Sequence, residues 1–414
     1  MRNIGDFGRR ILTLSSGTAI AQIVTLAGLP LLSRLYAPED FGVLALFSAP
    51  TLILSAIMNL CLEKAILLPE QDRDAATLVW FCKILTLTVA VVAGLIVGAL
   101  FVAGLPAVWV GAIGISVLLL PLASSGAAIF ALLSSKCIRA DQFRPLANAT
   151  IVKAAVLLVS QLTLGLMGLG SAGLIIGFVI GQWAGNTMLA SVGQSAVRPQ
   201  RALREAFRLL SRYRSFPLYS VPATLANTSA THLIALLVGA SMGSATLGLF
   251  SMTQRVLALP STLISAAISN VFLRELAANR RAGRSSRRLF DRVILRASAT
   301  SAVIFGSIGF LGPELFSLAL GPEWREAGTY ASLLAPMYFF RFIQSCIATT
   351  TIAFERQRFA LGSQLFYLSA ALFSFAASQF CSDRMIAFLV IFMLTGSAHS
   401  LTVTFLMRRM TKGA

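Results

Sequence analysis

Two arginines lie deep inside long apolar segments of the chain, where a charge is costly. Arg255 lies about eight residues into the segment Leu247–Phe272, and Arg341 lies about eleven residues into Tyr330–Ile352. The central parts of these and similar segments hold no Asp or Glu to pair with them. A guanidinium binds a phosphate through two parallel hydrogen bonds. The arginines therefore predict a site for an anion such as a phosphate or pyrophosphate; the alternative is a contact with a backbone carbonyl or a helix end.

Other polar side chains recur at helical spacing in the apolar segments. A polar stripe on a membrane helix points to a lumen or to a contact with another helix. For isolated Ser and Thr residues, helix packing is the commoner role. The larger polar side chains on or beside these stripes are Gln22, Asn227, His232, Gln254 and Gln344.

The composition tells what kind of protein must hold these side chains. Hydrophobic residues make up 57% of the 414 residues and charged residues only 12%. A soluble globular chain has about 25% charged residues, and a disordered chain has far fewer apolar ones. The five cysteines show neither a CxxC spacing nor a partner histidine, so no metal site and no cofactor are expected. The remaining class is a membrane protein with several spans.

Twelve segments are apolar and long enough to cross a bilayer, which takes about 20 residues. The connections alternate between short, nearly uncharged turns and longer basic ones, as the positive-inside rule requires when both termini are cytoplasmic. We therefore predict an all-α integral membrane protein with twelve transmembrane helices. The segments are Ile11–Ser33, Phe41–Cys61, Ala76–Ala103, Trp109–Leu133, Asn148–Gly168, Ser171–Ser191, Leu218–Ala240, Leu247–Phe272, Val293–Leu311, Tyr330–Ile352, Leu361–Phe380 and Met385–Met407.

The longest basic connection before the middle of the chain divides six predicted spans from six. It places arginines and apolar residues at helical spacing, the pattern of an amphipathic helix on a membrane surface. We expect an N-terminal six-helix lobe at 1–192, a cytoplasmic amphipathic linker at 193–216 and a C-terminal six-helix lobe at 217–414.

The net charge of +18 follows mostly from this topology. Only Arg34, Arg325 and Arg384 fall on the predicted outer side, and the other basic residues outside the spans fall on the cytoplasmic side. Topology thus explains the arginine clusters without a nucleic-acid partner. The short loops leave no room for a soluble catalytic domain, and the phosphate-binding pattern GxxxxGK[ST] is absent, so we expect no enzyme.

Five short motifs, in order along almost the whole chain, resemble the bacterial polysaccharide and O-antigen flippases. These belong to the multidrug/oligosaccharidyl-lipid/polysaccharide exporter superfamily. The motifs are Leu35–Gly42 (LYAPEDFG), Glu63–Pro69 (EKAILLP), Tyr213–Tyr219 (YRSFPLY), Gln254–Pro260 (QRVLALP) and Gly321–Gly328 (GPEWREAG).

The resemblance implies a V-shaped pair of six-helix lobes around a central cavity in the bacterial inner membrane. It implies alternating access that moves a polyprenyl-pyrophosphate-linked oligosaccharide between the leaflets. Arg255 and Arg341 would then hold the pyrophosphate, with Arg34 at the outer mouth. The five larger polar side chains, Gln22, Asn227, His232, Gln254 and Gln344, would bond sugar hydroxyls.

The resemblance also implies ion coupling, but no carboxylate lies in mid-span to carry it. Glu63, at the inner end of the second predicted span, and His232 are the nearest candidates. The expected partners are the lipid-linked substrate, membrane lipids and polysaccharide polymerase or assembly proteins.

Three other functions remain as alternatives. A drug or cation antiporter of the same superfamily predicts a mid-span carboxylate, which the chain lacks. A membrane polysaccharide polymerase predicts a large outer loop, and the largest predicted outer loop, Gly312–Thr329, is short. A purely structural membrane protein leaves the two intramembrane arginines without a role.

Overall fold

The computed structural model of the chain describes residues 4–103, 113–190, 203–281, 285–354 and 357–410. These residues form helices joined by turns, and no strand occurs among them. The chain divides into two compact units, residues 1–232 and residues 233–414, which are described separately below. The division falls within a helix, after His232, so the predicted boundary at 193–216 stays a prediction.

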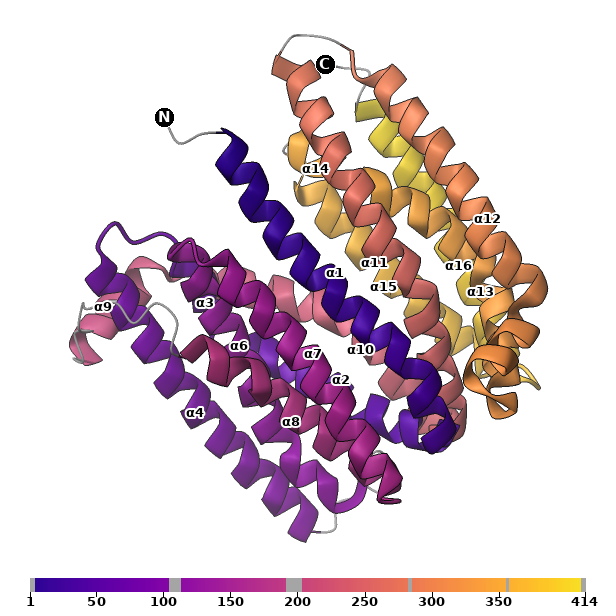
Figure 1. The fold of residues 1–414 in the computed structure, drawn as a ribbon, viewed down its shortest axis with the longest axis horizontal. Helices are drawn as coiled ribbons and strands as arrows, with labels where there is room; N and C mark the ends of the chain where they lie inside the picture. Colours follow the sequence, from indigo (N-terminus) through magenta and orange to yellow (C-terminus); the bar gives the residue numbers. More distant parts are fainter. Residues whose placement is uncertain (1–3, 104–112, 191–202, 282–284, 355–356, 411–414) are drawn as a thin grey trace. The chain divides into compact units, whose positions relative to one another are not determined.

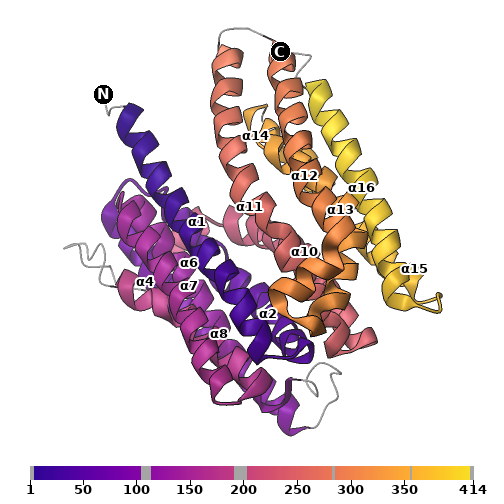
Figure 2. The same cartoon turned by 45° about the vertical axis from the view of Figure 1, so that its right-hand side comes forward.

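The first unit is a bundle of long helices that run beside one another (Figures 1 and 2). Between the longer helices lie a 3-10 helix at Gly114–Leu119 and a short π-helix at Phe216–Ser220. The last helix, α10, begins in this unit and ends in the next. The helices are α1 (Ile4–Leu35), α2 (Pro38–Met58), α3 (Leu62–Ala65), α4 (Asp72–Val102), α6 (Leu120–Arg139), α7 (Phe143–Leu166), α8 (Gly170–Ala190), α9 (Leu203–Arg212) and α10 (Val221–Met242).

Buried hydrogen bonds tie the helices of the first unit together. Asn59, only 2% exposed, accepts a hydrogen bond of 2.5 Å from the Thr86 hydroxyl and donates one of 2.9 Å to the Ala128 carbonyl. This amide therefore joins the end of α2 to α4 and α6. The Tyr36 hydroxyl donates a bond of 2.6 Å to the carbonyl of Gln161, which fixes the end of α1 against α7. Satisfied polar groups of this kind specify one packing arrangement in an apolar environment.

The second unit is a bundle built mainly from five long helices (Figures 1 and 2). Its large buried side chains include Phe250 and Phe388, whose ring centroids lie 5.6 Å apart. Residues Pro322–Trp324 form a single 3-10 turn. The helices are α11 (Ser244–Arg281), α12 (Arg287–Leu320), α13 (Arg325–Ile347), α14 (Thr350–Ala353), α15 (Gln357–Ser378) and α16 (Arg384–Met410).

Helices α11 and α13 run in the same direction, which two contacts establish. Near their N-terminal ends the Thr253 hydroxyl donates a hydrogen bond of 2.8 Å to the Ala327 carbonyl. Toward their C-terminal ends the hydroxyls of Ser269 and Thr349 are 3.3 Å apart. A parallel pair has one common register, so the depth of a side chain on one helix can be compared with depth on the other.

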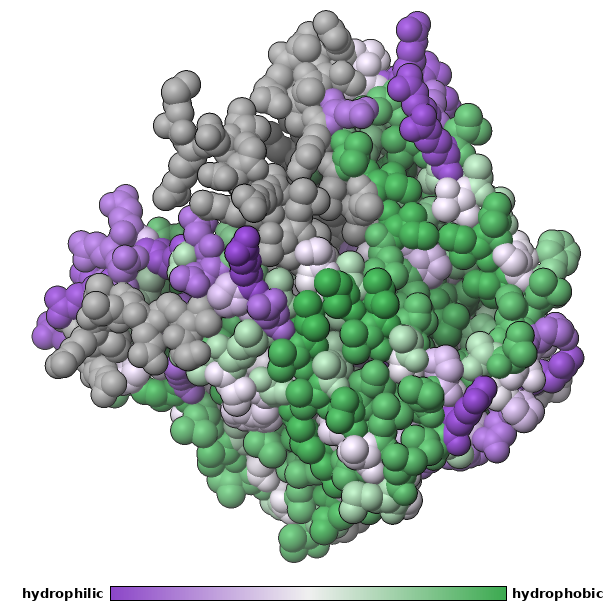
Figure 3. Space-filling model, in the orientation of Figure 1, coloured by the Kyte–Doolittle hydropathy of each residue, from purple (hydrophilic) through white to green (hydrophobic). Residues whose placement is uncertain are grey.

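The helices agree with the predicted spans. Within the described residues each of the twelve predicted segments overlaps a long helix, while residues 109–112 of the fourth segment and residue 191 of the sixth lie outside them. Eight helices in the described part of the chain are apolar and long enough to span a membrane. Figure 3 shows a broad apolar surface over the centre and bottom of this face, with hydrophilic side chains gathered mainly at the upper left, upper right and lower right. The all-helical membrane fold is therefore confirmed, while the count of twelve spans and the side of the termini stay predictions.

The fifth predicted segment and the helix that it belongs to begin at different residues. The fifth predicted segment begins at Asn148, but α7 begins at Phe143, directly after a tight turn with Asp141 at a positive φ of 56°. Lys153, five residues beyond the predicted start of the segment, therefore lies ten residues beyond the first residue of this helix. At 1.5 Å per residue this is about 15 Å along the helix axis.

Candidate functional site

Arg341 of α13 is held by two tyrosines. Its Nη1 donates a hydrogen bond of 2.7 Å to the Tyr367 hydroxyl on α15. Its guanidinium carbon lies 4.9 Å from the centroid of the Tyr367 ring and 5.7 Å from that of Tyr338. A cation over an aromatic face is attracted by the ring's negative quadrupole. Among the described residues no carboxylate pairs with Arg341, and the residue is exposed, so this cation is positioned by neutral groups and open to an anion.

Tyr367 also contacts a histidine, His399, on α16. The rings of Tyr367 and His399 have centroids 5.6 Å apart, and the Phe366 ring stacks on the imidazole at the same centroid distance. The Nε2 atom of His399 is 3.0 Å from the Ser363 hydroxyl. Its Nδ1 atom is buried and has no hydrogen-bond partner in the part of the chain described. Arg341, Tyr367 and His399 thus link α13, α15 and α16.

The sequence identified Arg341 but not Tyr367 or His399. Ser363 and Tyr367 are four residues apart and therefore share a face of α15. That spacing was the available signal, but their partner on α16 becomes known only from the packing of the two helices.

Arg255 lies on α11 and is partly buried. Its depth can be compared with that of Arg341 through the two contacts that join α11 to α13. Counted from those contacts at 1.5 Å per residue, the two arginines differ in depth by roughly 9 to 18 Å, with Arg255 nearer the N-terminal ends of both helices. The second unit therefore carries the two arginines of its predicted spans at different levels, about two to three helical turns apart. Gln254 and Gln344, on the same two helices, are partly buried.

The first unit holds the other predicted site residues. Gln22 of α1 is partly buried, and Arg34, in the last turn of the same helix, is exposed. His232 of α10 is partly buried. Asn227 belongs to α10, but its side chain lies outside what the structure describes. The described contacts do not bring these side chains together, so their shared role stays a prediction.

Glu63 of α3 is a carboxylate in a poor environment for charge. One of its oxygens, Oε2, is buried and has no hydrogen-bond partner among the described residues. Burial raises the pKa of this carboxyl above its usual range, and the neighbouring Lys64 opposes that shift in part. The Lys64 ammonium is itself 3.2 Å from the Thr224 hydroxyl of α10. Glu63 can therefore hold a proton at a pH where an exposed carboxyl has lost it.

The structure draws attention to a further cation, in a helix of the first unit. Lys153 of α7 is partly buried, and its Nζ lies 4.5 Å from the centroid of the Phe130 ring on α6. The sequence missed this residue because it lies only a few residues beyond the predicted start of its span.

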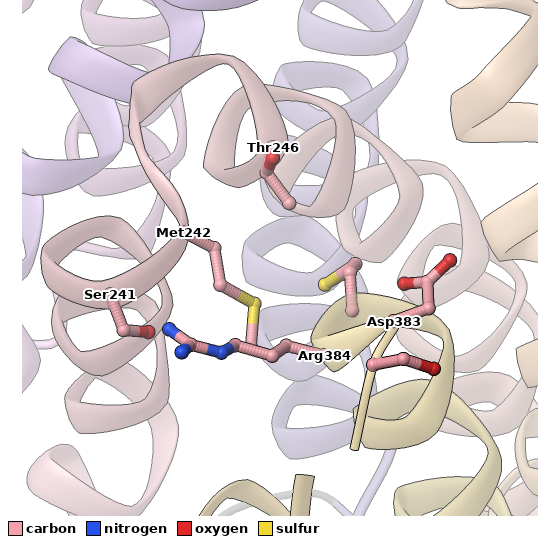
Figure 4. Close-up of a pocket in the computed structure, with 7 residues that line it drawn as sticks. Ser241, Met242, Thr246, Asp383 and Arg384 are labelled. Atoms are coloured by element: carbon pink, nitrogen blue, oxygen red, sulfur yellow. The ribbon is translucent and has the colours of Figure 1, made fainter. Parts of the chain in front are cut away.

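A pocket of about 520 Å³ opens in the second unit at the turns that join α10 to α11 and α15 to α16. Figure 4 shows the Arg384 side chain extending toward Ser241 beside Met242, while the carboxyl group of Asp383 points away from it. Asp383 Oδ1 accepts a hydrogen bond of 3.0 Å from the backbone N–H of Ile386, at the start of α16. None of the predicted site residues lines this pocket.

Comparisons with known proteins bear on this arrangement. A family model described as "Polysaccharide biosynthesis protein" matches residues 31–329. A structure of the lipid II flippase MurJ in an inward closed conformation superposes with a TM-score of 0.75 at 13% identity, covering 95% of this chain and 87% of that one. No curated protein sequence matches significantly.

Two transporters extend the structural likeness. An inward-facing multidrug resistance MATE family transporter of the MOP superfamily has a TM-score of 0.67 at 13% identity, with 97% of this chain and 94% of that chain covered. The Vibrio cholerae MATE transporter VcmN has a TM-score of 0.56 at 11% identity, with coverages of 98% and 97%. At these identities the likeness shows a shared fold.

Proposed function

The chain belongs to the family of polysaccharide biosynthesis proteins, and from that premise we propose that it is a flippase for lipid-linked oligosaccharides. It moves polyprenyl-pyrophosphate-linked units across the bacterial inner membrane by alternating access, for a surface polysaccharide such as the O-antigen of lipopolysaccharide or an exopolysaccharide. The membrane-transporter fold shared with MurJ and the MATE proteins supports transport rather than catalysis.

The observation that carries this proposal is the environment of Arg341. A cation inside a membrane helix is retained for a functional reason, since its insertion is costly. Tyr367 takes one of its hydrogen bonds, and both tyrosines offer π faces, so its positive charge is oriented but not neutralised. A pyrophosphate supplies the planar arrays of acceptor oxygens that a guanidinium binds best.

The two arginines act in succession in this proposal. Their difference in depth, roughly 9 to 18 Å, favours contacts with two positions of the headgroup over a joint grip on one pyrophosphate. Under the predicted topology Arg341 lies deeper toward the cytoplasm and meets the substrate first, and Arg255 then receives it. Arg34 completes this series at the outer mouth.

The neutral polar side chains have the complementary task of binding sugar hydroxyls. Amide side chains both donate and accept hydrogen bonds, which suits hydroxyl groups. We assign this role to Gln22, Asn227, His232, Gln254 and Gln344. Glu63 is the candidate for proton coupling, because its carboxyl has an elevated pKa and a buried oxygen without a partner. His232 is the second candidate.

The test is a flipping assay in proteoliposomes with a fluorescent polyprenyl-pyrophosphate oligosaccharide. Arg341→Gln should abolish flipping while the protein still inserts and purifies. The control is Arg325→Gln, which removes an exposed arginine from α13, the helix of Arg341. Arg325 is paired with Glu314 of α12 at 2.9 Å. Normal flipping by Arg341→Gln, or transport of cationic drugs in place of the lipid, would contradict the proposal.

A further inference from the structure

Helix α9 packs on the first unit with only part of its apolar face. Ala206 is fully buried and Leu209 is 1% exposed. Both belong to a cluster that includes Leu78 and Phe81 of α4. These contacts lie near the N-terminal end of α4, which begins at Asp72, so α9 covers one end of the helical bundle.

The rest of the apolar face is open. Leu203 is 56% exposed and Phe207 is 58% exposed. The Phe207 ring nevertheless lies against Phe81, with centroids 6.2 Å apart. Farther along α4 come the exposed side chains Ile84 and Leu87, on a stretch long and apolar enough to cross a membrane. The open edge of α9 therefore continues the apolar surface that α4 presents to lipid.

The opposite side of α9 is basic. Arg204, Arg208 and Arg212 are exposed and lie on one arc of the helix. Arg208 is paired with Glu205 of the same helix. Among the described residues no carboxylate forms an ion pair with Arg204 or Arg212, so part of this positive charge is open to an external anion.

We propose that α9 binds a lipid surface rich in anionic phospholipids. Leu203 and Phe207 enter the boundary between headgroups and acyl chains, while Arg204 and Arg212 contact the phosphates. A helix of this kind lies in the interface and is attracted by anionic lipid. Figure 3 shows hydrophilic side chains gathered at the α9 end of the first unit, beside the apolar surface of the bundle. The continuity of apolar surface with α4 favours a membrane over a nucleic acid or a soluble acidic protein as the partner.

The first experiment measures thermal unfolding of the full-length protein in nanodiscs of phosphatidylcholine, with and without phosphatidylglycerol. Anionic lipid should raise the Tm of the wild type, and the double variant Arg204→Gln/Arg212→Gln should lose most of that rise. The control, Arg325→Gln/Arg384→Gln, removes the same amount of charge from exposed positions outside α9. Anionic lipid should raise the Tm of this control as much as that of the wild type. A wild type indifferent to phosphatidylglycerol, or an equal loss in the control, would overturn the proposal.

The second experiment locates α9 and does not depend on folding energetics. In a Cys381→Ser background, which removes an exposed thiol, a fluorophore is attached at Phe207→Cys or at Arg208→Cys, which lies on the basic arc of the helix. Brominated phospholipid should quench the label at position 207 several-fold more than the label at 208. Equal quenching at both positions would show that α9 does not lie in the interface. Neither experiment depends on which substrate is transported.

Discussion

The guanidinium of Arg341 and the phenol of Tyr367 form a hydrogen bond of 2.7 Å, and the cation also lies 4.9 Å from the centroid of the same ring. One tyrosine thus makes two contacts with one arginine. The ring of Tyr367 in turn touches that of His399, so the position of Arg341 depends on the packing of α15 against α16. Neutral partners keep the charge of Arg341 available for a substrate, where a carboxylate would cancel it.

Tyr367→Phe separates the two contacts. The ring stays, so the cation–π contact remains, but the hydrogen bond to a charged group is lost, a change worth about 1.5–3 kcal/mol. We expect binding of polyprenyl pyrophosphate to weaken by roughly ten- to a hundredfold, since 1.4 kcal/mol corresponds to a factor of ten. Titration calorimetry in detergent measures this change.

The control for this variant is Tyr330→Phe. It removes a tyrosine hydroxyl that donates a 2.7 Å hydrogen bond to Glu326 on α13 itself, away from Arg341. Equal losses of affinity in the two variants would argue against a positioning role for Tyr367.

Glu63 gives stability a specific pH dependence. Burial raises its pKa in the folded protein, so the folded state holds this proton more tightly than the unfolded state does. Its contribution therefore favours folding below the unfolded pKa and is lost as pH rises through the folded pKa. Glu63→Gln should remove this dependence and stabilise the protein at high pH, as measured by thermal unfolding across a pH series. The control is Glu70→Gln, at an exposed carboxyl. If the Glu63→Gln and Glu70→Gln variants showed the same dependence of Tm on pH, this role of Glu63 would be refuted.

Periodicity predicts the helices of this chain, while packing decides which of their side chains meet. The helices follow from apolar runs of sufficient length, because each satisfies its own backbone hydrogen bonds in lipid. Arg255 and Arg341 follow as well, since a charge in such a run is conspicuous. The partners of Arg341 do not follow, because Tyr367 and His399 lie on other helices. Lys153 was missed for a different reason, which is that a turn at Asp141 starts α7 earlier than the hydropathy indicates.

The contact between α12 and α13 depends on two glycines. A Cβ atom at Gly328 would collide with the backbone of Gly312, so the two helices approach more closely than any side chain permits. Gly328→Ala should push the helices apart and cost about 1–3 kcal/mol, as overpacking does. Thermal unfolding in detergent measures the loss. Gly306→Ala on α12 is the control, because its added methyl meets nothing within 4 Å. That variant should be neutral or stabilising, since alanine favours a helix.

The difference in depth between Arg255 and Arg341 predicts the outcome of a double-mutant cycle. Two arginines that grip one pyrophosphate together would show a large interaction free energy, because the loss of one changes what the other holds. Two arginines at successive positions should act independently, with effects that add within about 0.5 kcal/mol. We therefore expect Arg341→Gln to weaken binding of polyprenyl pyrophosphate strongly, and Arg255→Gln to slow flipping more than it weakens binding. Calorimetric titration measures binding and a proteoliposome assay measures flipping, each for both single variants and the double variant. A strongly non-additive binding cycle would place both guanidiniums on the same headgroup and would contradict passage from one to the other.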